Sequence, residues 1–237
     1  SNYSDLLNFY AISVSLVSDA YYKMTGREHF TDSDAKGLMW TNVPPTAVNR
    51  CLRLSCLTSD YAEIWSQCSE HYKALPWSRS HPSLENIDNF KLGDWSMAVG
   101  LRSEYVRRLA LIEIDVLVAM AFGMTLEQLL EIYKIYFPVL QKKERNTYFD
   151  RNGKVVWISA KGSENVGMLN EKGKKIIRAE FEKIITSGIS NVSCEVIDDT
   201  LPGDPQTITR TFEGPFDTCD RVEDYKRAWA YFETHRA

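Results

Sequence analysis

Basic side chains concentrate in one part of this chain, where they could neutralise phosphate groups. Residues 134–178 contain eleven Lys and Arg side chains against four Asp and Glu, a net charge of +7. The whole chain carries −4, so the remaining residues carry −11. A stretch of this kind can face nucleic-acid phosphates, although a solvated surface is the commoner explanation of a charge run.

Three cysteines and a histidine lie close enough in sequence to suggest a metal site: Cys51, Cys56, Cys68 and His71. Cys68 and His71 are three residues apart and would share one helix face. Zinc ligands, however, usually stand in short knuckles rather than along a single helix, and cysteine also packs well in a core. We therefore expect no metal site here.

Glu113 and Asp115 place two acids in an otherwise apolar helix. A charge in such a helix must be paired or hydrogen-bonded. Arg107 and Arg108 lie within a turn or two, so the preferred interpretation is a salt network, either inside the helix (Arg108 with Glu113, for example) or with a partner elsewhere. A buried polar site at an interface is the alternative.

The remaining motifs indicate no active site in this chain. Asp198-Asp199 could be metal carboxylates, but the following strand has no Lys, so we interpret the pair as an acidic turn. Residues 42–45 approach the Asn-Pro-Pro-aromatic motif of amino-methylating enzymes, yet Val43 interrupts it and Thr46 replaces the aromatic. Cofactor-binding glycine loops and nucleophile motifs are also missing from the sequence. We expect no catalytic and no cofactor-binding residue.

Hydrophobic spacing predicts a helical first half. We expect one helix of about 18 residues beginning near Leu6, then helices over 45–72, 104–122 and 125–136. Thr125 and Gln128 form a capping box for the last of these. Residues 74–94 are rich in turn formers and indicate a weak boundary or an exposed loop.

The pattern changes after residue 140. Strands over 147–149 and 154–159 flank an Asn-Gly turn, a strong hairpin signal. A helix over 172–186 follows, then strands over 192–197 and 206–212 and a final helix after Asp220. The predicted fold class is α+β, a mainly helical half (1–140) followed by a small α+β half with short antiparallel strands (141–237). The two regions could also form one compact domain.

Composition excludes several broad classes of protein. With 237 residues, 44% of them hydrophobic, the chain can bury a sizeable core. Its longest apolar run is interrupted by Glu113 and Asp115, so it falls short of a membrane span. Five cysteines without a framework spacing indicate a reducing compartment. We therefore expect a cytoplasmic protein without membrane contact.

Four blocks of sequence resemble a known family. They are 52–58 (LRLSCLT) with 61–65 (YAEIW); 107–119 (RRLALIEIDVLVA); 132–133 with 137–140 (FPVL), 144–148 (ERNTY) and 150–153 (DRNG); and 198–203 (DDTLPG) with 215–216 and 220–229 (DRVEDYKRAW). Together they resemble the C-terminal region of large bacterial class I S-adenosylmethionine-dependent DNA methyltransferases. Proteins of that family belong to restriction-modification and related phage-defence systems. The resemblance runs from about residue 46 to residue 236.

The resemblance implies that the methyltransferase core, with its S-adenosylmethionine site, lies upstream in a longer parent protein, of the adenine-N6 type. This chain would then be a non-catalytic region that helps to recognise or hold DNA, binding it weakly on its own. Arg145, Arg151, Lys154 and Lys161 are the candidate DNA contacts, because they cluster around the predicted hairpin. The alternative is a structural or protein-interaction module that docks on the core without contacting DNA.

Overall fold

The computed structural model describes residues 3–26, 29, 31–68, 75–158, 172, 176–188, 190–198 and 202–235. It divides into two compact units. The helical unit contains residues 1–102, 106–138 and 221–237, and the mixed unit contains residues 103–105 and 139–220. The expected α+β class, with a helical first half, is confirmed; the last helix of the chain returns to the helical unit.

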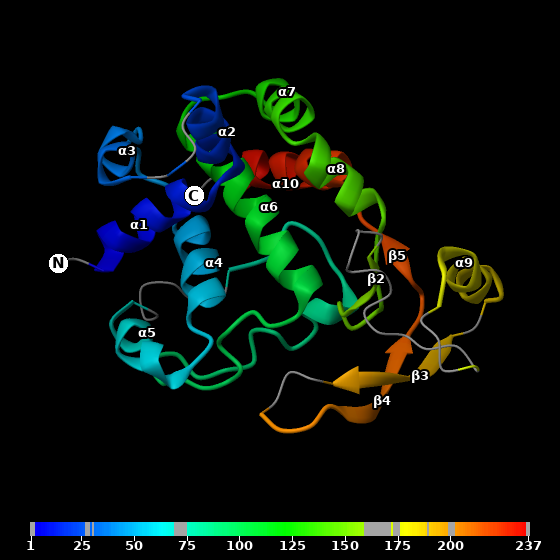
Figure 1. Ribbon diagram of the computed structural model, residues 1–237. Coiled ribbons are helices and arrows are strands. Elements are labelled where there is room, and N and C mark those ends of the chain that lie inside the picture. Colours follow the sequence, from blue (N-terminus) through cyan, green and yellow to red (C-terminus); the bar gives the residue numbers. More distant parts are fainter. Residues whose placement is uncertain are drawn as a thin grey trace. The chain divides into compact units, whose positions relative to one another are not determined.

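The helical unit is built around one long apolar helix, α6 (Glu104–Ala121), which runs through its centre in Figure 1. Most of the side chains of α6 are buried. The helices around it are α1 (Tyr3–Val14), α2 (Leu16–Met24), α3 (Asp32–Gly37), α4 (Pro45–Ser55), α5 (Ala62–Cys68), α7 (Leu126–Tyr136) and α10 (Arg221–Thr234).

Two helix predictions for the first half are wrong, because each expected helix is divided into two. The first breaks at Ser15, which has an extended backbone and whose hydroxyl accepts a hydrogen bond from the N–H of Ser18. Serine is a favoured N-cap because its oxygen satisfies a free N–H of the new helix. The expected helix over 45–72 ends at Ser55, and a 3₁₀ turn (Ser59–Tyr61) separates α4 from α5.

The α6–α7 region follows the prediction. The side chain of Thr125 accepts from the N–H of Gln128 at 3.3 Å, and the side chain of Gln128 accepts from the N–H of Thr125 at 2.9 Å, which completes the expected capping box. The sequence pattern did not predict α8 (Pro138–Arg145), which begins two residues after the end of α7. Proline fits the first turn of a new helix, where its missing N–H costs nothing.

The mixed unit contains a three-stranded sheet in the order β2-β1-β5 and a separate two-stranded ribbon. In the sheet, β1 (Thr147–Phe149) pairs antiparallel with both β2 (Val155–Ile158) and β5 (Asp217–Thr218). The hairpin expected on either side of the Asn-Gly turn is therefore confirmed. The helix expected over 172–186 is α9 (Arg178–Thr186), which begins later than predicted.

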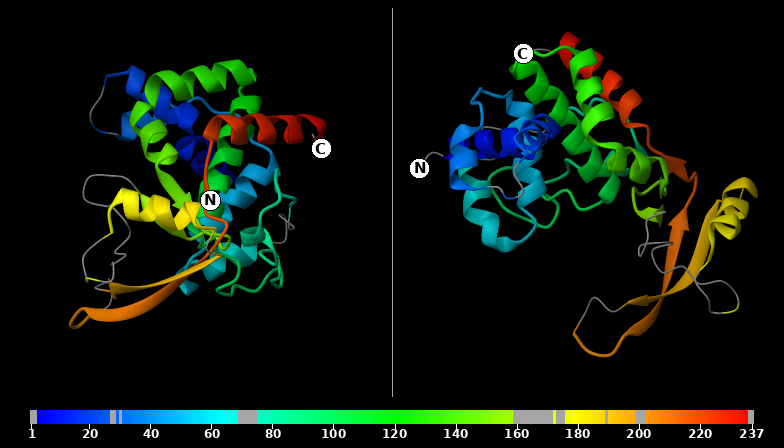
Figure 2. Two further views of the ribbon diagram at one scale, coloured as in Figure 1. Left: turned by 90° about the vertical axis from the view of Figure 1, so that its right-hand side faces the viewer. Right: turned by 45° about the horizontal axis from the view of Figure 1, so that its top comes forward.

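The ribbon of the mixed unit consists of β3 (Asn191–Asp198) and β4 (Gln206–Glu213), which pair over their full length. In the right-hand view of Figure 2 it extends away from α9. At its base, Phe212 enters a small core with Val156 and Phe181, and Tyr148 packs edge-on against Phe181 at 5.2 Å between ring centroids. This core joins the ribbon, α9 and the β1 sheet within the unit.

Residues 75–103 form a long connection that contains only one 3₁₀ turn (Pro82–Leu84). The sequence predicted an exposed loop or a weak boundary over 74–94. The described residues 75–94 form a loop in which none is buried, as the first alternative predicts, whereas no unit boundary falls there because the segment belongs to the helical unit. Across the described ranges, no helix is both long and apolar enough to cross a membrane.

Candidate functional site

The turn between β1 and β2 is fixed by the carboxylate of Asp150. Its Oδ1 accepts hydrogen bonds from the backbone N–H groups of Asn152 at 2.9 Å and Lys154 at 2.8 Å. Gly153 has a φ of +77°, a left-handed conformation that glycine adopts without strain. Asp150 itself is only 1% exposed. The turn is therefore held from inside, while its basic side chains face solvent.

Arg151 and Lys154 are the two candidate DNA contacts on this turn, and both are exposed. The N–H of Arg151 donates to the carbonyl of Glu213 at 2.8 Å, which ties the turn to the base of the ribbon. The Arg151 guanidinium lies 4.0 Å from the Glu213 carboxylate, with both side chains about half exposed. An exposed pair at that distance contributes at most about 1 kcal/mol, so Arg151 remains available to another anion.

The other two candidate DNA contacts lie outside the turn. Arg145 is the last residue of α8; it is exposed, and its Nε donates to the carbonyl of Gln141 at 3.3 Å. Asn146 and the three residues of β1 separate it from the turn, and β1 alone spans roughly 10 Å. Lys161 lies outside the described residues. The structure thus describes three of the four candidates and presents all three to solvent.

The two buried acids of α6, Glu113 and Asp115, have partners on other helices. Glu113 is fully buried, and its Oε2 accepts from Nε of Arg50 on α4 at 2.8 Å. Its second oxygen accepts from the N–H of Ser78 at 2.7 Å. The suggested pairing of Arg108 with Glu113 is wrong, whereas the prediction of a partner elsewhere is confirmed.

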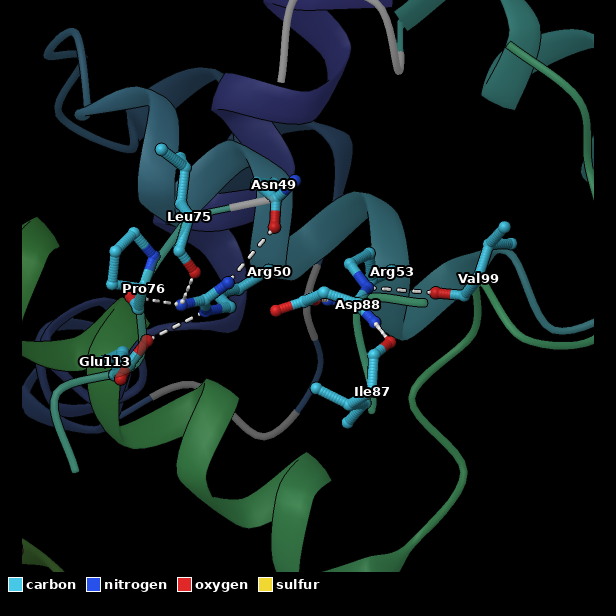
Figure 3. A network of polar contacts seen from close by, with 9 residues as sticks. All are labelled: Asn49, Arg50, Arg53, Leu75, Pro76, Ile87, Asp88, Val99 and Glu113. Carbon is cyan, nitrogen blue, oxygen red and sulfur yellow. Dashed lines mark hydrogen bonds and ion pairs between the residues drawn. The ribbon is translucent and has the colours of Figure 1, made fainter. Parts of the chain in front are cut away.

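Arg50 and Arg53 fasten the long connection to α4, as Figure 3 shows. Nη2 of Arg50 donates to the carbonyls of Leu75 and Pro76. Arg53 pairs with Asp88 and donates to the carbonyls of Ile87 and Val99. Both arginines are fully buried. Because their donors are occupied by protein acceptors, they hold the connection in place and do not offer an open anion site.

A second buried network joins α6 to α2 and α10. Asp115 accepts from Nη1 of Arg221 at 3.1 Å, from the hydroxyl of Tyr225 at 2.7 Å and from the N–H of Leu16 at 2.7 Å. Burial, and then the nearby Asp115 carboxylate, raise the pKa of the Tyr225 hydroxyl well above its usual value. The phenol therefore stays protonated and donates to Asp115.

Arg108 adds a further contact between α6 and α10. It donates to Oδ2 of Asp224 at 2.6 Å, and Arg79 from the long connection pairs with the other oxygen of Asp224. Glu113, Asp115 and Arg108 of α6 thus serve to join helices. We expect these groups to stabilise the helical unit rather than to react with a ligand.

Cysteine chemistry receives no support from the described residues. Cys51, Cys56 and Cys68 are buried, and burial raises the pKa of each thiol, that of Cys56 to about 12. A protonated, buried thiol is a poor nucleophile and a poor metal ligand. No metal-binding group of three or more suitable side chains occurs among the residues searched, which leave out His71 and Asp199.

Comparison of this chain with protein-family models, with curated proteins and with solved structures finds no match.

Proposed function

We propose that this chain is the non-catalytic C-terminal region of a bacterial DNA methyltransferase of a restriction-modification or phage-defence system, and that it helps to hold target DNA in the cytoplasm. The observation that carries the DNA contact is the turn 150–154. A buried Asp150 fixes its backbone, while Arg151 and Lys154 stand in solvent. A rigid turn with exposed cations can position a duplex through its phosphates without reading the bases.

Charge sets the strength expected of this contact. Non-specific binding through phosphates has a Kd of about 10⁻⁴ to 10⁻⁶ M at physiological salt. The acidic remainder of the chain opposes binding through its long-range field. We therefore place the chain alone at the weak end of that range, with the parent's methyltransferase core and S-adenosylmethionine site supplying the chemistry.

A direct test compares two variants that lose the same charge. The first replaces Arg145, Arg151, Lys154 and Lys161 by Ala. The control replaces by Ala four lysines that already pair with an acid three or four residues away in the sequence: Lys23, Lys36, Lys91 and Lys226.

Fluorescence anisotropy with a labelled duplex at low salt should show weaker binding for the first variant and much less change for the control. Equal losses would mean that only net charge matters, and the proposed contact would then be wrong.

The second candidate function is a docking module that does not touch DNA. It is favoured by exposed apolar side chains on the helical unit, where Met39 and Trp40 are 55% and 54% exposed. Side chains of this kind are suited to cover another protein surface, such as a methyltransferase core. Absence of DNA binding by the unmodified chain even at low salt would favour this candidate.

A further inference from the structure

A single asparagine joins two basic segments that lie far apart in the sequence. Nδ2 of Asn146 donates to the carbonyl of Lys142 at 2.7 Å, and its Oδ1 accepts from Nη1 of Arg178 at 2.9 Å. Arg178, the first residue of α9, is thereby held at the carboxyl end of α8. This contact spans 32 positions of the chain.

The side chains around Asn146 present positive charge to solvent. Lys142, Lys143 and Arg145 in the last turn of α8 are exposed, whereas Glu144 between them is only 7% exposed. Within the described ranges, the ammonium groups of Lys142 and Lys143 form no ion pair. Among the four cations described at this junction, Arg178 alone forms an ion pair, with Glu182 at 2.7 Å, and both side chains of that pair are half exposed.

Helix electrostatics favours the cations of α8 and gives Arg178 a mixed environment. Cations in the last turn of α8 stabilise its negative carboxyl end. Arg178 occupies the first position of α9, where a cation is unfavourable, but its pair with Glu182 and its place at the carboxyl end of α8 offset that cost. Lys142, Lys143 and Arg145 have no ion-pair partner among the described residues, so the junction presents an excess of positive charge that an external anion would balance.

The ribbon of the same unit carries the opposite charge. Its strands contain Glu195, Asp198 and Glu213 against a single Arg210. A duplex bound by the mixed unit would be attracted to the α8–α9 junction and repelled by the ribbon. The charge distribution therefore limits where phosphates can be bound within this unit.

We propose that Lys142, Lys143 and Arg178, next to Arg145, form a second phosphate-binding surface for duplex DNA. This inference rests on the proposed function and adds three residues to its contacts. Arg178 uses Nε and Nη1 for Glu182 and Asn146. A guanidinium has five N–H donors, so those of Nη2 remain for a phosphate oxygen.

The experiment uses two double variants matched in charge, residue type and unit. Lys142→Ala/Arg178→Ala removes the proposed contacts, and Lys183→Ala/Arg210→Ala removes an exposed Lys and Arg from α9 and the ribbon. Anisotropy of a labelled duplex over a salt series gives the slope of log K against log salt. Each lost phosphate contact should make it shallower by about 0.9.

We expect the first variant to lose about 1.8 from the slope and the control to keep the slope of the unmodified chain. Equal slopes for the two variants, in a chain whose binding does depend on Arg151 and Lys154, would overturn this inference alone. Absence of any duplex binding by the unmodified chain would overturn both this inference and the proposed function. Circular dichroism checks that all variants remain folded.

Discussion

Replacing Asp115 by Ala should destabilise the helical unit strongly. The carboxylate is 3% exposed and accepts from three donors: the guanidinium of Arg221, the hydroxyl of Tyr225 and the N–H of Leu16. Its removal leaves the Arg221 cation, itself 8% exposed, without this partner. The polar atoms that lose Asp115 lie on α2 and α10, so the change loosens two helices from α6.

The size of the effect follows from what is left buried. Removing one partner of a buried ion pair costs about 3 to 5 kcal/mol, because the other charge stays in the interior. A buried N–H left without an acceptor adds about 1 to 3 kcal/mol. These terms overlap, so we expect a loss of at least about 3 kcal/mol in the free energy of unfolding.

Urea unfolding followed by tryptophan fluorescence measures this loss. Asp19→Ala is the matched control, because Asp19 is half exposed and pairs with Lys23 on the same helix. It should cost less than about 0.5 kcal/mol. A double-mutant cycle with Arg221→Ala should show coupling of about 0.5 to 3 kcal/mol. A loss below about 1 kcal/mol for Asp115→Ala would refute the assignment of a buried ion pair.

Three further outcomes can be checked on the same protein. Burial raises the pKa of Cys51, and burial together with Cys68 raises that of Cys56 to about 12, whereas unfolded thiols ionise near pH 9. The unfolded state therefore loses protons first as pH rises, and the free energy of unfolding should fall above about pH 9, by about 1.4 kcal/mol per pH unit and thiol. Cys51→Ala/Cys56→Ala should flatten this decline in urea titrations at about pH 8 and about pH 10.5, and an equal decline would exclude the thiols as its cause. Thr125→Ala should cost about 1 kcal/mol in a thermal melt by removing the cap of α7, and an unchanged melt would contradict the capping role. Titration calorimetry of this chain with S-adenosylmethionine should give no binding, and a micromolar Kd, worth about −8 kcal/mol, would contradict the assignment of the cofactor site to the parent's core.

Structural features that depend only on residues close together in the sequence could be predicted from it. The capping box of Thr125 and Gln128 and the Asn-Gly turn after β1 each span four residues, so each could be recognised from neighbouring positions in the sequence. Ser15 could have been recognised as a helix start, since serine favours that position. It was missed because the apolar run on both sides of it suggested one continuous helix.

Partners distant in sequence could not be assigned from the sequence. The apolar surroundings of Glu113 required a partner, but Arg50 lies 63 residues away and no local spacing points to it. The same holds for Asn146 and Arg178, which meet across 32 positions. The exposure of Arg151 and Lys154 agrees with the position chosen for them at the turn, although their contact with DNA remains a proposal.

The salt dependence of duplex binding tests the central proposal most directly. If Arg145, Arg151, Lys154 and Lys161 each contact a phosphate, together they contribute about −3.6 to the slope of log K against log salt. Replacing all four by Ala should therefore make the slope shallower by about 3.6, and the contacts proposed at the α8–α9 junction account for the slope that remains. A variant with the slope of the unmodified chain would show that these residues do not contact DNA.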